Sequence, residues 1–241
     1  MKSEFKNTDA LSYLFGLENE SVDLLLTDPP YAISRGTGFS SGEAKGKDTD
    51  RFRVSYEFGD WDKVDLNYFK EVFSMVYKKL RKGGTCIVFY DLWKIQELKE
   101  LLEGCGFKMF RFLEWIKTNP VPINSKVNYL TNSREVAILC VKGSKPTFNS
   151  SYDNGVYEYP IYQGEDRFHT TQKSLKLFED LIEKHSNIGD TVLDIFSGSA
   201  TTQVAAINKG RVYLGCEKDE TIYAKSLERV KNYEFELKKD D

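Results

Sequence analysis

An apolar run near the start of the chain ends in a carboxylate, two prolines and an aromatic ring: Asp28, Pro29, Pro30 and Tyr31. The prolines fix two φ angles and lack N–H groups, so the carbonyls beside them are rigid acceptors. The Asp28 side chain and the Asp28 or Pro29 carbonyl could together accept both hydrogens of one –NH₂ group. Tyr31 adds a flat face for a ring. The stretch therefore predicts a pocket for an aromatic amine, such as the edge of a flipped base, with a plain proline turn as the alternative.

A second apolar run ends in a carboxylate and a turn of small residues, in the stretch VLDIFSGSATT at 192–202. Such a strand-to-helix turn lies at the carboxyl edge of a doubly wound sheet, where ligands bind. Gly198 would let a ligand approach the backbone, and Glu217, at the end of the next apolar run, could accept both hydroxyls of a ribose. The spacing predicts a nucleoside-binding turn, with a turn that binds no ligand as the alternative.

The carboxylate within this stretch, Asp194, indicates what kind of nucleoside would bind. A carboxylate beside a helix N-terminus suits a cationic group, such as an amine or sulfonium, better than a pyrophosphate. A helix-capping role is the alternative. The dinucleotide fingerprint G-x-G-x-x-G is not matched, because its positions read Gly198, Ala200 and Gln203. A nicotinamide dehydrogenase is therefore disfavoured.

Apolar runs alternate with helical patterns along the chain, which is typical of an α/β fold with helices covering a sheet. The patterns predict strands over 22–27, 85–90, 107–116, 135–141, 191–196 and 211–216. They predict helices over 67–80, with a stop at Gly83 and Gly84, and over 172–185. Two stretches lack both periodicities. We expect a mobile loop over 32–60 and a small insert in the region of 142–171.

The composition limits the class of protein. The 241 residues are 40% hydrophobic and 29% charged, which suits one globular domain, with or without an insert. No apolar stretch reaches the length of a membrane span and the start lacks a signal-peptide core, so we expect a cytoplasmic protein. The four cysteines have no C-x-x-C spacing, and His169 and His185 are the imidazoles of the sequence. We therefore expect no metal site.

The net charge is −3, yet basic residues concentrate in two regions where we expect contacts with phosphates. Between 117 and 148, one acidic residue, Glu135, stands against five basic ones, an excess of +4: Lys117, Lys126, Arg134, Lys142 and Lys145. The glycine-rich loop adds Arg35, Lys45, Lys47, Arg51 and Arg53. For each of these side chains, a solvated surface charge is the alternative.

The stretches TDPPY and VLDIFSGSATT resemble the S-adenosylmethionine-dependent DNA amino-methyltransferases, and their order is similar to the permuted β group of that family. Further segments resemble this group in the same order: FGDWDKVDLNYF, LRKGGTCIVF, EWIKTNPVPINSKVNYLTNSREVAILC, HTTQKSLKLFEDLI and GRVYLGCEKDETIYAKSLERV. The resemblance covers most of the chain. It implies a Rossmann-like sheet of seven strands, one of them antiparallel, with helices on both faces. It also implies methyl transfer from S-adenosylmethionine to the N6 amine of a flipped adenine in DNA.

The resemblance implies a role for individual residues. The target amine would be held by Asp28, Pro29, Pro30 and Tyr31. The methyl donor would be lined by Asp28, Asp194, Phe196, Gly198, Ser199 and Thr201, its ribose bound by Glu217, and its methionine end covered by Thr171 and Lys173. The implied organisation is a catalytic part over 1–117, a small target-recognition insert over 118–168 and a donor-binding part over 169–241.

Two departures from the family pattern leave alternatives open. Ala200 stands where a glycine is usual, which would weaken donor binding if its φ is positive, and Thr170 stands where a proline is usual. The alternatives are the N4 amine of cytosine, an amine of RNA or of a protein glutamine, and a catalytically silent subunit. The resemblance predicts DNA as the partner and makes a homodimer plausible.

Overall fold

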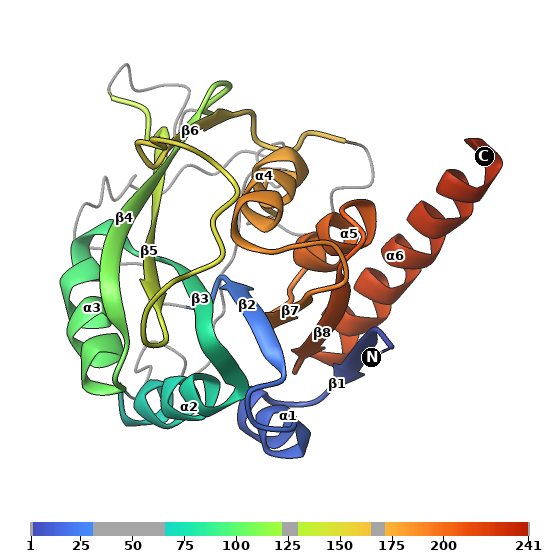
Figure 1. The fold of residues 1–241 in the computed structure, drawn as a ribbon. Helices are drawn as coiled ribbons and strands as arrows, with labels where there is room; N and C mark the ends of the chain where they lie inside the picture. The colour runs from blue at the N-terminus through green and yellow to red at the C-terminus, as the bar shows by residue number, and fades with distance from the viewer. Residues whose placement is uncertain (1, 31–65, 122–129, 165–171, 241) are drawn as a thin grey trace, which may run out of the picture.

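The computed structural model describes residues 2–30, 66–121, 130–164 and 172–240, the side chains of 234–240 excepted (Figure 1). Within these ranges, one eight-stranded sheet has the order β1-β8-β7-β2-β3-β5-β4-β6. Its strands are β1 Glu4–Asn7, β2 Val22–Thr27, β3 Leu80–Tyr90, β4 Lys108–Lys117, β5 Arg134–Val141, β6 Val156–Tyr159, β7 Thr191–Asp194 and β8 Val212–Glu217. Neighbouring strands are parallel except that β5 is antiparallel to both β3 and β4. The predicted α/β class and the single antiparallel strand are confirmed.

Two strands, β1 and β6, were not among the predicted apolar runs, and the sheet has eight strands where the resemblance implied seven. Strand β6 pairs with β4 at the edge of the sheet. It lies in the stretch that was expected to be irregular. Without it, the outer edge of β4 would expose a row of unpaired backbone groups; instead Glu114 and Thr118 donate to the carbonyls of Gly155 and Tyr159, at 2.8 and 3.2 Å. The range proposed as an insert, 118–168, contributes β5 and β6 to the main sheet. Its role as a target-recognition insert stays a prediction.

Helices cover both faces of the sheet (Figure 1). They are α1 Ala10–Gly16, α2 Leu66–Lys79, α3 Ile95–Gly104, which follows the 3₁₀ turn η2 Leu92–Lys94, α4 Leu175–His185, α5 Thr201–Asn208 and α6 Glu220–Asp240. One core cluster packs α1, α2 and α3 on the side of β2 that carries Leu25. The other packs α4 and α5 on the side that carries Leu24 and Leu26. Because both faces of β2 are covered, its sequence is a continuous apolar run rather than an alternating one.

The predicted helix stop at Gly83 and Gly84 was wrong. Helix α2 ends at Lys79, and both glycines lie within β3. Gly83 has a φ of +84°, and a Cβ atom there would lie 2.8 Å from the carbonyl oxygen of Lys145. The glycine therefore allows the chain after β5 to approach β3 closely.

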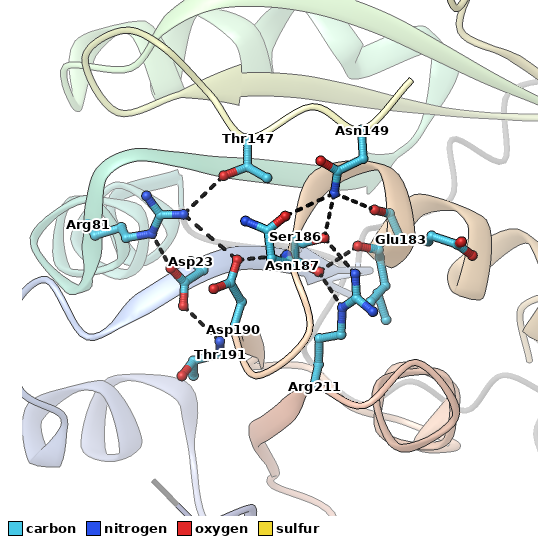
Figure 2. A network of polar contacts seen from close by, with 11 residues as sticks. Asp23, Arg81, Thr147, Asn149, Glu183, Ser186, Asn187, Asp190, Thr191 and Arg211 are labelled. Atoms are coloured by element: carbon cyan, nitrogen blue, oxygen red, sulfur yellow. Dashed lines mark hydrogen bonds and ion pairs between the residues drawn. The ribbon is translucent and has the colours of Figure 1, made fainter. Parts of the chain in front are cut away.

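A polar network joins β2, β3 and β7 at their amino ends (Figure 2). The Asp23 carboxylate on β2 accepts from Arg81 Nε on β3 and, at 2.7 Å, from the backbone N–H of Thr191 on β7, 168 residues further along the chain. Arg81 also donates to Thr147 Oγ1 at 3.0 Å and lies 3.8 Å from Asp190. Asp23 thus ties the first part of the chain to the last.

The same network closes the carboxyl end of α4 (Figure 2). Asn149 Nδ2 donates to the carbonyls of Glu183 and Ser186, at 3.0 and 2.9 Å. Arg211 donates to the same Ser186 carbonyl at 2.6 Å. These contacts satisfy carbonyls that the last turn of a helix leaves without partners.

Among the described helices, none is both long and apolar enough to cross a bilayer.

Replacing Asp23 tests whether this network stabilises the fold. We expect Asp23→Ala to lower the free energy of unfolding by about 2 kcal/mol, because it leaves Arg81 and the Thr191 N–H without their shared acceptor. Urea unfolding followed by circular dichroism measures the loss. Glu103→Ala, which removes an exposed ion pair of α3, is the control and should cost less than about 0.5 kcal/mol. Equal losses of stability in the two variants would contradict the stabilising role of the Asp23 network.

Candidate active site

Strands β2 and β7 lie side by side and parallel, with Leu24 opposite Val192 and Leu25 opposite Leu193. Their carboxyl ends therefore open at the same edge of the sheet. There Thr27, directly before Asp28, donates its hydroxyl to Asp194 Oδ1 at 2.7 Å. The structure thus brings together the two sequence stretches that were expected to carry the chemistry. We call this pair of strands the β2–β7 seam.

Asp194 is buried at this seam, with 3% of its surface exposed, and both of its carboxylate oxygens have partners. Oδ1 also accepts from the Phe196 N–H at 3.1 Å, and Oδ2 accepts from the Thr202 hydroxyl at 2.5 Å. Burial raises the pKa of Asp194 to about 6, against the opposing effect of these hydrogen bonds. The carboxylate joins β7 to β2 and, through the Thr202 hydroxyl, to the first turn of α5, whose N-cap is Ala200. A contact of Asp194 with a donor cation stays a prediction.

The turn after β7 is held by a carboxylate at the end of β8. Glu217 Oε2 accepts from the Gly198 N–H and Oε1 from the Asp219 N–H, both at 2.9 Å. Helix α6 braces the same turn, because Arg229 donates to the carbonyl of Ser199 at 2.6 Å. Burial raises the pKa of Glu217. The predicted donor-binding residues of this turn are therefore held together by one short network.

Ala200, where the family pattern has a glycine, has a positive φ of 60° and no exposed surface. The left-handed conformation costs a residue with a Cβ atom about 1 kcal/mol. Its methyl group packs against Val204 and Val230 in a small cluster under α6. The sequence predicted weaker donor binding if the φ of Ala200 is positive. That condition is met, and the weaker binding itself stays a prediction.

The end of the site at Asp28 carries a chain of charged side chains, of which Lys173 is buried and the others are partly buried. Lys173 Nζ lies 2.6 Å from Asp28 Oδ2 and 2.7 Å from Glu135 Oε2, and Lys117 Nζ lies 2.7 Å from Glu135 Oε1. Burial raises the pKa of Asp28, and the charge of Lys173 opposes that shift. Although burial would raise the pKa of Glu135, the two lysines lower it to about 2.

Three side chains at this end have buried polar atoms without hydrogen-bond partners among the described residues. One is Glu135, whose Oε2 has its ion pair with Lys173. Another is Asp28, whose carboxylate oxygen Oδ1 is buried. The third is Gln172, directly before Lys173, whose amide oxygen and nitrogen are both buried and unpartnered. Buried polar atoms of this kind are rare in folded proteins and mark places where a ligand or water completes the site.

The predicted site residues fall into three groups. The structure joins Thr27–Asp28, the Phe196–Thr201 turn, Glu217 and Lys173 at one edge of the sheet. Other predicted residues lie outside the described ranges and stay predictions: Tyr31, Arg35, Lys45, Lys47, Arg51, Arg53, Lys126 and Thr171. The third group consists of the basic residues around β5.

The structure divides the described basic residues of 117–148 between the two edges of the sheet, and their contacts with phosphates stay a prediction. Strand β5 is antiparallel and eight residues long, so its two ends are roughly 25 Å apart. Arg134 lies at the same edge as Asp28, where it pairs with Glu114 at 2.8 Å. Lys142 and Lys145 lie at the opposite edge, and the Lys142 ammonium there contacts the Leu80 carbonyl at 2.8 Å and Glu20 at 3.1 Å. Lys117 is paired with Glu135 in the charge chain.

Four contributors to the site were not predicted: Thr27, Thr202, Lys117 and Glu135. Thr27 directly precedes Asp28 and Thr202 lies in the first turn of α5, and a lone threonine at either position is a weak signal. Glu135 had been treated only as a charge that offsets the lysines around it. An acidic residue at the start of an apolar strand could have indicated a buried ion pair, because an unpaired charge is not stable there.

Comparison with solved structures identifies the class to which this fold belongs. The structure of the M1.HpyAVI–SAM complex matches with a TM-score of 0.71 at 24% identity, over 95% of this chain and 99% of that one. The cytosine-N4-specific PvuII DNA methyltransferase matches with a TM-score of 0.72 at 18% identity, over 94% and 86%. The fold is that of the Rossmann-like methyltransferases.

Sequence comparison identifies the family. Residues 22–228 match the family described as DNA methylase. The Type II methyltransferase M2.DpnII of Streptococcus pneumoniae is 30% identical over 233 residues, which cover 88% of this chain and 84% of the relative. M.HinfI of Haemophilus influenzae is 28% identical over 246 residues, covering 90% and 66%. The chain belongs to the DNA methylase family, and the resemblance to S-adenosylmethionine-dependent DNA amino-methyltransferases is confirmed.

The pKa of Asp194 predicts how this residue makes stability depend on pH. Its folded-state pKa of about 6 lies above the ordinary 3.8, so its contribution is full below pH 3.8 and lost as pH rises through 6. Asp194→Asn removes this loss. At each pH, the free energy of unfolding of the variant is subtracted from that of the wild type. We expect this difference to fall by about 2 kcal/mol between pH 4 and 7.

Urea unfolding of both proteins across this range measures the difference. The comparison is needed because buried His185, whose pKa burial lowers to about 4, acts oppositely: its contribution is present above pH 6.5 and lost as pH falls. Since His185 is present in both proteins, its effect cancels. If the difference between the two free energies of unfolding does not change with pH, the raised pKa of Asp194 is contradicted.

Proposed function

We propose that the protein transfers a methyl group from S-adenosylmethionine to the N6 amine of an adenine flipped out of DNA. The observation that carries the proposal is Asp28 Oδ1, a buried carboxylate oxygen without a hydrogen-bond partner among the described residues, at the edge of the sheet where the β7–α5 turn also lies. A carboxylate oxygen accepts hydrogen bonds and does not donate them. An amino group from a substrate would satisfy it.

The residues of the β7–α5 turn fit the proposed donor. Gly198, with a φ of +48°, has no side chain to keep a ligand away from the turn, and Glu217, which accepts from the Gly198 N–H, can accept ribose hydroxyls on its remaining lone pairs. The buried amide of Gln172 offers both a donor and an acceptor that nothing described satisfies. The donor itself would supply a methyl group already activated by a sulfonium. The protein then has to orient and shield the reacting groups.

Asp28 would act directly on the amine. The exocyclic nitrogen of adenine is a poor nucleophile because its lone pair is delocalised into the ring. Hydrogen bonds from the amine to Asp28 Oδ1 and to the Pro29 carbonyl would favour a pyramidal nitrogen and stabilise the positive charge that develops there. Asp28 can then take the proton that the nitrogen releases. This role requires the ionised carboxylate, so the rate should fall as pH drops through the pKa of Asp28.

The choice of adenine over cytosine rests on the resemblance of the TDPPY stretch, in which an aspartate stands where a serine would favour cytosine. The solved neighbours include a cytosine-N4-specific enzyme, so the fold is compatible with both bases. Contacts of Arg134 and of the loop arginines and lysines with DNA phosphates, a recognition role for 118–168, a cytoplasmic location and a homodimer are part of this proposal on the same basis.

Incubation of the purified protein with duplex DNA and labelled S-adenosylmethionine tests the function. Mass analysis of the nucleosides should find N6-methyladenine. N4-methylcytosine alone would correct the base. Absence of label from DNA, with donor binding detected by calorimetry, would overturn the choice of DNA, and competition by RNA or peptide would identify the other substrate.

Replacing Asp28 tests its assigned role. We expect Asp28→Ala to lower methyl transfer at least about 100-fold, because the acceptor for the amine is lost, while calorimetry still detects donor binding. Asp91→Ala is the matched control: Asp91 follows the adjacent parallel strand β3 and caps η2 through the Trp93 N–H at 2.8 Å. That variant should keep transfer within about threefold of the wild type. Near-normal transfer by Asp28→Ala would remove the assigned role.

A further inference from the structure

Asp28 lies at one end of a chain of alternating charges that runs from the target-amine site into the sheet. The order is Asp28, Lys173, Glu135, Lys117, with contacts of 2.6, 2.7 and 2.7 Å. Each residue comes from a different part of the fold: the end of β2, the segment before α4, the start of β5 and the end of β4. The four formal charges sum to zero.

Because Lys173 is buried, the positions of the charged side chains in this series depend on one another. Its side chain is 6% exposed, whereas that of Lys117 is 15%, of Asp28 20% and of Glu135 23% exposed. A buried ammonium is stable when carboxylates compensate its charge, and Lys173 has one on each side. Its position is therefore set by both Asp28 and Glu135. If Glu135 were neutral, its charge would no longer oppose the attraction of the ammonium to Asp28.

We propose that Glu135 and Lys117 are positioning residues for methyl transfer: they hold the Lys173 ammonium so that it fixes Asp28 Oδ2 and leaves Oδ1 free for the target amine. This inference rests on the proposed role of Asp28. Lys173 contacts the reacting carboxylate, and Glu135 acts through Lys173. Lys117 acts one step further away by holding Glu135 Oε1.

The chain also balances the charge around Asp28. Charged groups face Asp28 from each element packed against it: Lys173, Glu135 on β5, Lys117 on β4 and Asp194 on β7. After burial, the largest influence on the pKa of Asp28 is Lys173, which lowers it; Glu135 raises it and Lys117 lowers it. Glu135 thus offsets part of the effect of Lys173, and Lys117 offsets part of the effect of Glu135.

Two variants, Glu135→Gln and Lys117→Met, test the proposal through shifts of opposite sign. Since activity requires ionised Asp28, the acidic limb of the pH profile of kcat follows its pKa. Glu135→Gln should move that limb to lower pH and Lys117→Met should move it to higher pH. We expect Glu135→Gln also to lower the maximal kcat by about 10- to 100-fold, because Asp28 is drawn toward Lys173 and the amine is misplaced.

The assay measures methyl transfer to duplex DNA at saturating donor and substrate from pH 5 to 9, with thermal melts of each variant. Glu103→Gln is the control, because it makes the same chemical change at an exposed ion pair on α3, with side-chain exposures of 36% and 58%. Its profile should match that of the wild type. If Glu135→Gln does not fold, the upward shift in Lys117→Met still tests the proposal.

The possible outcomes separate this inference from the function on which it rests. Opposite shifts in the two variants support the charge chain as a positioning device. Lower stability with an unmoved pH profile would show that the chain only holds the strands together, and would overturn the inference while leaving the role of Asp28 intact. A wild-type protein that does not methylate DNA would instead overturn the proposed function.

Discussion

The site depends on the parallel pairing of β2 with β7. The two strands are separated by more than 160 residues in the chain, yet the register of Leu24 with Val192 places their last residues at the same edge of the sheet. A parallel pair requires a long crossover connection, which here contains most of the fold. Because side chains at the ends of adjacent parallel strands converge, this register alone brings Asp28 and the β7–α5 turn to one place.

Polar contacts fix the register at both ends of the seam. Asp23 accepts from the Thr191 N–H at the amino end, and Thr27 donates to Asp194 at the carboxyl end, at 2.7 Å in both cases. The apolar residues between them would tolerate sliding better, since apolar packing is not directional. A slip by one residue would separate the Thr27 hydroxyl from Asp194 and leave the Thr191 N–H without its acceptor Asp23, which is energetically costly. The same residues that fix the register also shape the site.

The reversal of β5 decides which charges reach this edge. Because β5 runs against its neighbours, its first residues, Arg134 and Glu135, lie at the edge that carries Asp28, while Lys142 is carried to the far edge. A group of basic residues that is compact in sequence is therefore divided in space. The acidic residue among them becomes the link between Lys173, which is buried, and Lys117, which is partly buried. Its charge matters to the site because few water molecules can screen it there.

The sequence by itself determined the α/β class, the elements that border the site, and the two stretches that carry the chemistry. These follow from local patterns: apolar runs define strands, small residues define the turn after β7, and the prolines after Asp28 set a rigid backbone. The family resemblance supplied the expected roles of these stretches.

Only the tertiary structure decided the partners of each charge. It paired Lys173 with Asp28 and Glu135, gave Ala200 a positive φ, added β6 to the edge of the sheet and separated Arg134 from Lys142. The physical reason is that the pairing of a buried charge depends on which strand ends meet. Strand order and direction arise from the packing of the whole chain, so local sequence does not specify them.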